Sequence, residues 1–162
     1  MPSTPEPRWL DESQQHSWRA LMMGITLLMD RLDEDLRREH GLSLAEYEIL
    51  VRLSERPGRC MRMAQIADSV AHSRSRITHT ITRMERAGLV TRSSSTEDGR
   101  GVDATLTDAG YDLLVRAAPS HVASVRSYVV DLCAAEDFAA LGRVMDAVSD
   151  NLVACHPEAE IR

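Results

Sequence analysis

Residues Met63 to Thr107 constrain the fold of this chain more than any other segment, because two short helices, a turn and a hairpin follow one another there. In the first helix, apolar residues recur at helical spacing at Met63, Ile66, Ala67 and Val70. The break at Ala71–Ser73 ends in a favoured N-cap residue, Ser73. After the run Arg74–Ala87, Gly88 suits the left-handed residue that ends a helix. This succession predicts a helix-turn-helix.

The second of these helices has two chemically different faces. At about 100° per residue, Ile77, Ile81 and Met84 share one face and Thr80 lies at its edge. Arginine can form two hydrogen bonds to guanine, and Ser, Thr and His can bond to bases or phosphates. The candidate DNA-binding residues here are therefore Ser73, Arg74, Ser75, Arg76, Thr78, His79 and Arg83. An ordinary solvated helix face is the alternative interpretation.

A hairpin is predicted directly after this helix. Leu89–Arg92 favours a strand, and Val102–Leu106 alternates as a half-buried strand does, with turn-forming residues between them. A helix-turn-helix followed by a hairpin is a winged helix-turn-helix, which lays one helix in the major groove. We expect Arg100 to enter a minor groove, braced by Asp98, and Arg92 to join the DNA contacts. The alternative is an exposed loop with an incidental ion pair.

Charge is distributed unevenly along the chain. The formal net charge is −6, yet Arg59 to Arg100 holds eight arginines and four acidic residues, a net +4. The remaining 11 arginines and 21 acidic residues give −10. The positive field therefore lies where the second helix and the hairpin are predicted.

The chain resembles the MarR family of bacterial transcription regulators over roughly residues 10 to 155. The matching runs are Gly41–Leu50, Arg62–Ala67, Ser73–Thr78, Arg83–Val90, Asp98–Gly101 and Leu106–Gly110. The family's wing pairs Asp with an Arg two residues later and closes on Leu-Thr, as this chain does at Asp98, Arg100, Leu106 and Thr107. Gly99 stands where many members carry a further arginine.

The resemblance implies a mainly α fold with a small β wing. It places a winged helix-turn-helix at about 43–107, between N- and C-terminal dimerisation helices at about 11–40 and 107–154. It further implies a repressor that binds double-stranded DNA. Residues 1–9, which are rich in proline, are predicted to be disordered, and residues 156–162 form a tail.

The flanking helices can also be placed from the sequence. Apolar residues recur at helical spacing from Asp11 to His40, before Gly41. Ser43 and Glu46 form a capping box for a helix to about Glu55. Thr107 should cap a helix through Leu132, and a last helix should run from Ala135 to Ala154. Sequence rules alone would break the first of these at Pro119, whereas the resemblance implies a helix that continues with a kink.

The last helices carry more apolar surface than a small DNA-binding module can cover. The residues that need a partner are Leu132, Phe138, Leu141, Val144, Met145, Val148 and Leu152. The family buries such helices by intertwining two subunits. We therefore expect a homodimer that reads a pseudo-palindrome with half-sites about one DNA turn apart, ~10–10.5 bp.

A small-molecule effector is implied by the resemblance alone. In the family, small aromatic or phenolic anions bind between the dimer helices and the DNA-binding lobe. The candidate pocket residues are Trp18, Met22, Tyr47 and Tyr111. Ordinary core packing is the alternative for each of them.

Two other functions stay open at this stage. Arg59 and Arg62 flank Cys60, and positive charge favours the reactive thiolate, so a redox-responsive regulator is one alternative. A winged-helix interaction module without DNA binding is the other. With no nucleophile elbow, P-loop, dinucleotide fingerprint or metal-ligand spacing, no enzyme, cofactor or metal site is expected. The absence of a signal peptide or membrane span predicts a cytoplasmic protein that does not contact membranes.

Overall fold

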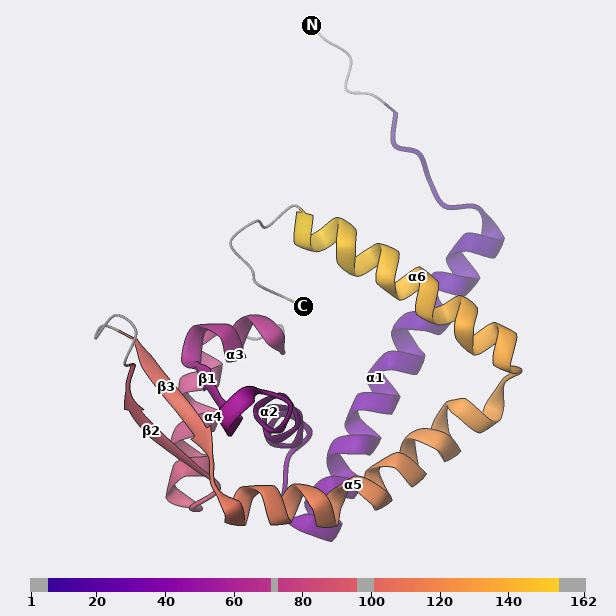
Figure 1. The fold of residues 1–162 in the computed structure, drawn as a ribbon. Coiled ribbons are helices and arrows are strands. Elements are labelled where there is room, and N and C mark those ends of the chain that lie inside the picture. Colours follow the sequence, from indigo (N-terminus) through magenta and orange to yellow (C-terminus); the bar gives the residue numbers. More distant parts are fainter. Residues whose placement is uncertain (1–5, 71–72, 96–100, 155–162) are drawn as a thin grey trace, which may run out of the picture.

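The computed structural model describes residues 6–70, 73–95 and 101–154, which form six α-helices, three strands and two short 3-10 segments (Figure 1). In chain order these are α1 (Glu12–His40), α2 (Leu44–Ser54), η1 (Pro57–Arg59), β1 (Cys60–Arg62), α3 (Met63–Ser69), α4 (Arg74–Arg86), β2 (Val90–Ser94), β3 (Val102–Leu106), α5 (Asp108–Tyr128), η2 (Val130–Leu132) and α6 (Ala135–Ala154). The predicted fold class, mainly α with a small β wing, is confirmed.

The helix ends lie close to the positions predicted from capping residues. Gly41 ends α1 with φ of 68°, and Gly88 follows α4 with φ of 73°, both in the left-handed region that glycine tolerates. Before α2, the Ser43 side chain accepts a hydrogen bond from the Glu46 N–H, and the Glu46 carboxylate accepts one from the Ser43 N–H. The predicted capping box is therefore confirmed.

The sheet contains one strand that the sequence did not reveal. β1 pairs antiparallel with β3, which pairs antiparallel with β2, so the strand order is β1-β3-β2. Cys60 lies opposite Thr105 in this sheet. A three-residue strand is too short to show an alternating pattern, so β1 is defined only by its partner β3.

One hydrophobic core joins the helices to the sheet. Its largest fully buried side chains come from α1, α2, α3, α4 and β2 and from the α1–α2 connection: Leu36, Leu42, Ile49, Leu50, Leu53, Ile66, Ile77, Ile81, Met84 and Val90. Helix α2 lies at the centre, because it contacts α1, α3, α4, α5 and two of the strands. The position of α4 therefore depends on the packing of α2.

Helix α5 continues through Pro119, as the resemblance implied and local sequence rules did not. Its end, however, was placed wrongly. The helix ends at Tyr128, because Val129 leaves the helical region with φ of −137° and ψ of −64°. The residues up to Leu132 form the 3-10 segment η2 instead.

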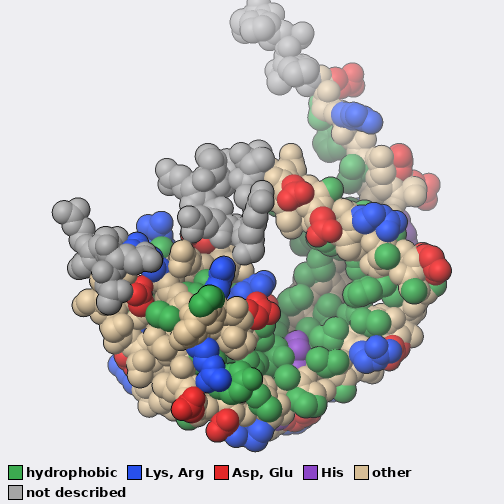
Figure 2. All heavy atoms as spheres, in the orientation of Figure 1, with side chains coloured by type: hydrophobic (Ala, Val, Ile, Leu, Met, Phe, Trp, Pro, Cys, Tyr) green, Lys and Arg blue, Asp and Glu red, His purple; other side chains and the backbone are tan. Residues whose placement is uncertain are grey.

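The terminal helices α1, α5 and α6 expose much apolar surface beside the winged lobe, which comprises the elements from α2 to β3. Within the described part of the chain, α6 makes no extensive contact with another element. Phe138, Leu141 and Val144 on this helix are exposed, as are Trp18 and Met23 on α1. Figure 2 shows hydrophobic side chains gathered in the hollow between the winged lobe and these helices. This apolar surface is unusually large for an isolated chain.

Residues 6–11 precede α1 without helix or strand, whereas residues 1–5 and 155–162 lie outside the described residues. The disorder predicted for residues 1–9 therefore stays a prediction. Among the described helices, none is both long and apolar enough to cross a membrane.

Gly110 tests the packing of α5 against the winged lobe. A Cβ added there would lie 2.2 Å from the Leu89 carbonyl oxygen and 2.7 Å from Leu106 Cδ1. We expect Gly110→Ala to destabilise the fold by about 1–3 kcal/mol, because backbone has to move. The matched control is Gly142→Ala in α6, where nothing lies within 4 Å, and a gain of about 0.5–1 kcal/mol is expected. Thermal melting of both variants measures this, and equal effects would contradict the close approach at Gly110.

Candidate DNA-binding interface

Helix α4 presents its polar face to solvent, as the helical wheel predicted. Ile77, Thr80, Ile81 and Met84 are buried against the core. The opposite side is exposed over the first two turns, and its exposed residues include Ser73, Arg74, Ser75, Arg76, Thr78 and His79. Ser73 caps the helix by accepting a hydrogen bond from the Arg76 N–H at 3.3 Å. A rigid helix with an uninterrupted polar face is therefore available at the surface.

Threonine hydroxyls on α4 donate to the helix itself. Thr78 Oγ1 donates to the Arg74 carbonyl at 2.9 Å, and Thr82 Oγ1 donates to the Thr78 carbonyl at 2.8 Å. Their protons are used inside the helix, so the outward-facing lone pairs act as acceptors. Among the predicted residues of this helix, Thr78 is therefore left as an acceptor, whereas Ser75, His79 and the arginines keep donor groups at the surface.

Arg83 has a partner that sequence reasoning did not foresee. Its Nε donates to Glu46 Oε1 on α2 at 2.7 Å, while its side chain stays 60% exposed. The Glu46 carboxylate is itself buried and also accepts hydrogen bonds from the Ser43 N–H and hydroxyl at 2.8 and 2.7 Å. Arg83 thus joins the polar face of α4 to the start of α2.

The electrostatics of Glu46 favour this arrangement. Burial by itself would raise the pKa of the Glu46 carboxyl, but hydrogen bonds from Ser43 and Arg83 outweigh it and hold the pKa below its ordinary value. The carboxylate is therefore ionised at neutral pH and orients the Arg83 guanidinium through the hydrogen bond from its Nε.

Arg92 on β2 is held in a similar way. Its guanidinium donates to Glu85 Oε2 from Nε at 2.9 Å and from a terminal nitrogen at 2.5 Å. This contact lowers the pKa of the Glu85 carboxyl. Arg92 therefore bridges the wing and the last turn of α4.

Three arginines converge beside the wing. Arg62, Arg74 and Arg92 line a hollow of about 370 Å³ together with Thr78 and Val102. Arg62 was missing from the sequence-based set, because it precedes α3 and lies next to β3 only through the β1–β3 pairing. The predicted tip residues Asp98 and Arg100 lie outside the described residues, so their roles stay predictions.

The four predicted effector residues come from three different helices, α1, α2 and α5. Tyr47 is buried against the His121 ring, with centroids 4.4 Å apart, and lines a pocket of about 420 Å³. Trp18 and Met22 are about half exposed on α1. Tyr111 lies under the guanidinium of Arg59, 3.9 Å from its ring centroid. Within the described residues, Tyr47 is therefore the member of this set that lines a pocket between helices.

Cys60 lies half-buried in β1, opposite Thr105. The neighbouring Arg59 is directed to Asp108, 3.2 Å away, and to Tyr111. Its charge is thus shared with an acidic group on α5, and the redox alternative stays a prediction. Across the described residues, no group of three or more His, Cys, Asp or Glu side chains is placed to hold a metal ion.

Comparison with known proteins identifies the family. The MarR family model matches residues 42–102, which run from the residue before the Ser43 cap to the start of β3. A curated relative, the HTH-type transcriptional regulator PecS of Dickeya dadantii, is 30% identical over 131 residues, 78% of this chain and 79% of PecS. The chain belongs to the MarR family. It is therefore a MarR-family transcriptional regulator.

Solved structures of MarR proteins agree with this assignment over nearly the whole chain. Sco3205 of Streptomyces coelicolor, a MarR family regulator solved in complex with DNA, is 41% identical with a TM-score of 0.88, covering 92% of this chain and 93% of its own. AbsC, a MarR family regulator of the same organism, is also 41% identical with a TM-score of 0.86, covering 91% and 99%. The likeness thus includes the terminal helices as well as the winged lobe.

The Glu46–Arg83 pair predicts a pH dependence of stability in this MarR protein. The folded-state pKa of Glu46 lies below the ordinary value of 4.5. The ionised Glu46 carboxylate therefore stabilises the folded state fully above pH 4.5, and this stabilisation is lost as the pH falls through the lowered pKa. We expect Glu46→Gln to cost about 1–2 kcal/mol at neutral pH and progressively less on acidification below 4.5.

Denaturant unfolding of wild type and Glu46→Gln from neutral to acid pH measures this difference. Glu48→Gln on the same helix is the matched control, because no hydrogen bond joins its carboxylate to a described residue. A Glu46→Gln deficit that stays constant with pH would show that the ionised pair does not stabilise the fold.

Proposed function

We propose that this MarR-family protein is a sequence-specific DNA-binding repressor that lays α4 in the major groove. The observation that carries the proposal is the exposed polar face of α4, from Ser73 to His79, above a fully buried apolar face. The N-terminal residues of a recognition helix are the ones that approach base edges. Sco3205, which is 41% identical to this chain and was solved in complex with DNA, supports the DNA binding proposed here.

The arginines divide into two roles in this proposal. Arg76 is exposed in the first turn, where it can hydrogen-bond a guanine edge. Arg83 lies two turns later and is anchored through Nε to Glu46, which leaves its terminal nitrogens without a partner among the described residues. A guanidinium held in this way suits a phosphate. The hollow beside the wing is lined by Arg62, Arg74 and Arg92. Their positive charge suits the phosphate backbone of the DNA next to the major groove that α4 would occupy.

We further propose that two chains form the active unit. Two observations support a dimer in which each chain covers the other. Apolar residues of α1 and α6 are exposed, and α6 makes no extensive contact with the other described elements. A two-fold dimer presents two copies of α4, here called the reading helices. This arrangement suits a pseudo-palindrome whose half-sites lie about one turn of DNA, ~10–10.5 bp, apart. Such a regulator acts on chromosomal DNA, which places it in the cytoplasm.

A small aromatic or phenolic effector is the last part of the proposal. The pocket of about 420 Å³ beside Tyr47 is lined by residues of α1, α2 and α5 and by the end of α3. It is large enough for such a ligand and lies between the helix α1 and the core that carries α4. Occupation of this pocket would release the repressor by shifting these helices. A redox response through Cys60 is the alternative trigger.

The base-contacting role proposed for Arg76 and the phosphate-contacting role proposed for Arg83 predict different changes in DNA affinity on substitution. Arg76→Ala should weaken operator binding by about 1–3 kcal/mol and relax preference at particular base pairs. Arg83→Ala should weaken specific and scrambled DNA about equally and reduce the salt slope by roughly one unit, because one counterion fewer is released. Salt-titrated binding to an operator selected from random DNA measures both variants.

Arg143→Ala on α6 is the control for loss of one positive charge far from α4, and thermal melting controls for the lost Glu46 contact in Arg83→Ala. The same uniform loss in both variants would refute the division of roles. Wild-type protein that selects no sequence would refute the DNA-binding proposal and favour an interaction module.

Assembly can be tested with a matched pair of glutamates on α6. Leu141 is part of the exposed apolar stripe, whereas Arg143 lies about 160° away around the helix, since each residue advances ~100°. Light scattering of the full chain should give twice 18.0 kDa. Leu141→Glu should shift the protein towards monomer and Arg143→Glu should not. A stable wild-type monomer at micromolar concentration would overturn the dimer.

A further inference from the structure

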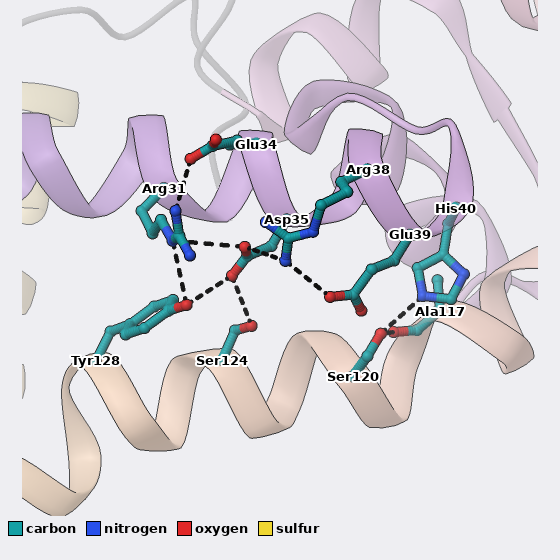
Figure 3. Close-up of polar contacts among 10 residues, drawn as sticks. All are labelled: Arg31, Glu34, Asp35, Arg38, Glu39, His40, Ala117, Ser120, Ser124 and Tyr128. Carbon is teal, nitrogen blue, oxygen red and sulfur yellow. Dashed lines mark hydrogen bonds and ion pairs between the residues drawn. The ribbon is translucent and has the colours of Figure 1, made fainter.

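A buried carboxylate joins α1 to the second half of α5. Asp35 on α1 is 5% exposed and lies among donors from two helices (Figure 3). Tyr128 Oη donates to its Oδ2 at 2.8 Å, and Ser124 Oγ donates to the same oxygen at 3.0 Å. Arg38 donates to Oδ1 at 2.7 Å, and Arg31 Nε lies 3.5 Å from that oxygen.

The two donors from α5, Ser124 and Tyr128, follow a proline within that helix. Pro119 has no N–H to donate to the carbonyl of Val115, so it permits bending at this turn. Ser120, Ser124 and Tyr128 follow it at intervals of four residues, which places them on one face of α5. All three are bonded to α1, since the Ser120 hydroxyl lies 2.7 Å from His40 Nε2. The face of α5 that follows the proline is thus fixed to α1 by side chains (Figure 3).

The same stretch of α1 is fixed to the DNA-binding lobe from its other side. Asp33 Oδ1 accepts a hydrogen bond from the Leu44 N–H at the start of α2, at 2.8 Å. Residues two apart on a helix point in nearly opposite directions. Asp33 therefore holds α1 to α2, while Asp35 holds α1 to α5.

Along the chain, α5 connects the winged lobe, which contains α4, to η2 and α6. The network therefore lies on the helix that links α4 to the exposed apolar surface of α6. The hydrogen bond from Tyr128, opposed by burial and supported by Ser124 and Arg38, keeps the pKa of Asp35 below its ordinary value. The carboxylate is therefore ionised and can accept all of these bonds at neutral pH.

We infer that Asp35, with Ser124 and Tyr128, is a positioning cluster that sets the distance between the two reading helices of the dimer and so the half-site spacing that the protein accepts. This inference rests on the dimer and DNA binding proposed above. The cluster itself touches no DNA. It acts by holding α5 beyond Pro119 at one angle to the winged lobe.

The first test measures geometry without DNA. A spin label is placed through Arg86→Cys at the end of α4, in a full chain carrying Cys60→Ser, Cys133→Ser and Cys155→Ser. Each dimer then yields one label-to-label distance by pulsed electron spin resonance. Tyr128→Phe and Asp35→Asn should broaden or shift this distribution relative to the parent. Arg126→Ala, which removes an exposed pair with Asp131 on the same part of the chain, should leave it unchanged.

The second test measures selectivity. Operator DNA is lengthened or shortened by one base pair between the half-sites, and the loss of affinity is compared between proteins. Tyr128→Phe should reduce the spacing penalty by about two- to tenfold, the effect of losing one hydrogen bond. Affinity for a single half-site should stay the same, which a general loss of folding would not allow. Tyr128→Phe keeps the ring packed and serves if Asp35→Asn fails to fold.

The outcomes separate this inference from the proposed function. Unchanged distances and an unchanged spacing penalty in Tyr128→Phe would overturn the positioning role while leaving DNA binding intact. A broadened distance distribution in Tyr128→Phe, together with a wild type that selects no DNA sequence, would support the positioning role of the cluster and refute the proposed sequence-specific DNA binding. A monomeric wild type would overturn both.

Discussion

The burial of α2 is the constraint on which the rest of this structure depends. Ile49, Leu50 and Leu53 are completely buried, and the helix contacts α1, α3, α4, α5 and the sheet. Burial of each such side chain stabilises a fold by about 1.5–3 kcal/mol. Because the apolar stripe of α4 packs on this helix, the direction of its polar face follows from the core and not from the polar residues themselves.

Polar contacts then fix the relative orientation of the helices, which hydrophobic burial alone does not determine. Apolar packing is non-directional, so neighbouring helices could slide or rotate at small cost. The Glu46–Arg83 contact joins α2 to α4, and the Asp35 cluster joins α1 to α5, each through hydrogen bonds with defined directions. Both clusters use an acidic group that is buried and ionised, which stabilises the fold only while every partner stays in place. These contacts therefore fix how α4 is oriented on α2 and how α5 is oriented on α1.

The terminal helices show a fold that is incomplete in one chain. α6 exposes Phe138, Leu141 and Val144 and makes no extensive contact with the other described elements. The hollow beside it is lined by hydrophobic side chains (Figure 2). A helix with this surface needs a second apolar surface, and the proposed dimer supplies one. In that proposed dimer, the distance between the two copies of α4 depends on how α1 and α5 are held together.

The sequence by itself determined the elements whose causes are local. Apolar periodicity located α1, α4 and α6, the Ser43–Glu46 box marked the start of α2, and Gly41 and Gly88 marked helix ends. The exposed face of α4 also followed from periodicity, because a helix that buries Ile77 and Ile81 has to turn Ser75 and His79 outward.

Only the tertiary structure decided the rest. Strand β1 exists through its pairing with β3, and the end of α5 at Tyr128 lies at its contacts with α1. The partners Glu46 for Arg83 and Asp35 for Tyr128 lie 37 and 93 residues away along the chain. No local sequence pattern predicts partners that lie so far apart along the chain, because ion pairs and buried carboxylates depend on which helices the core brings together.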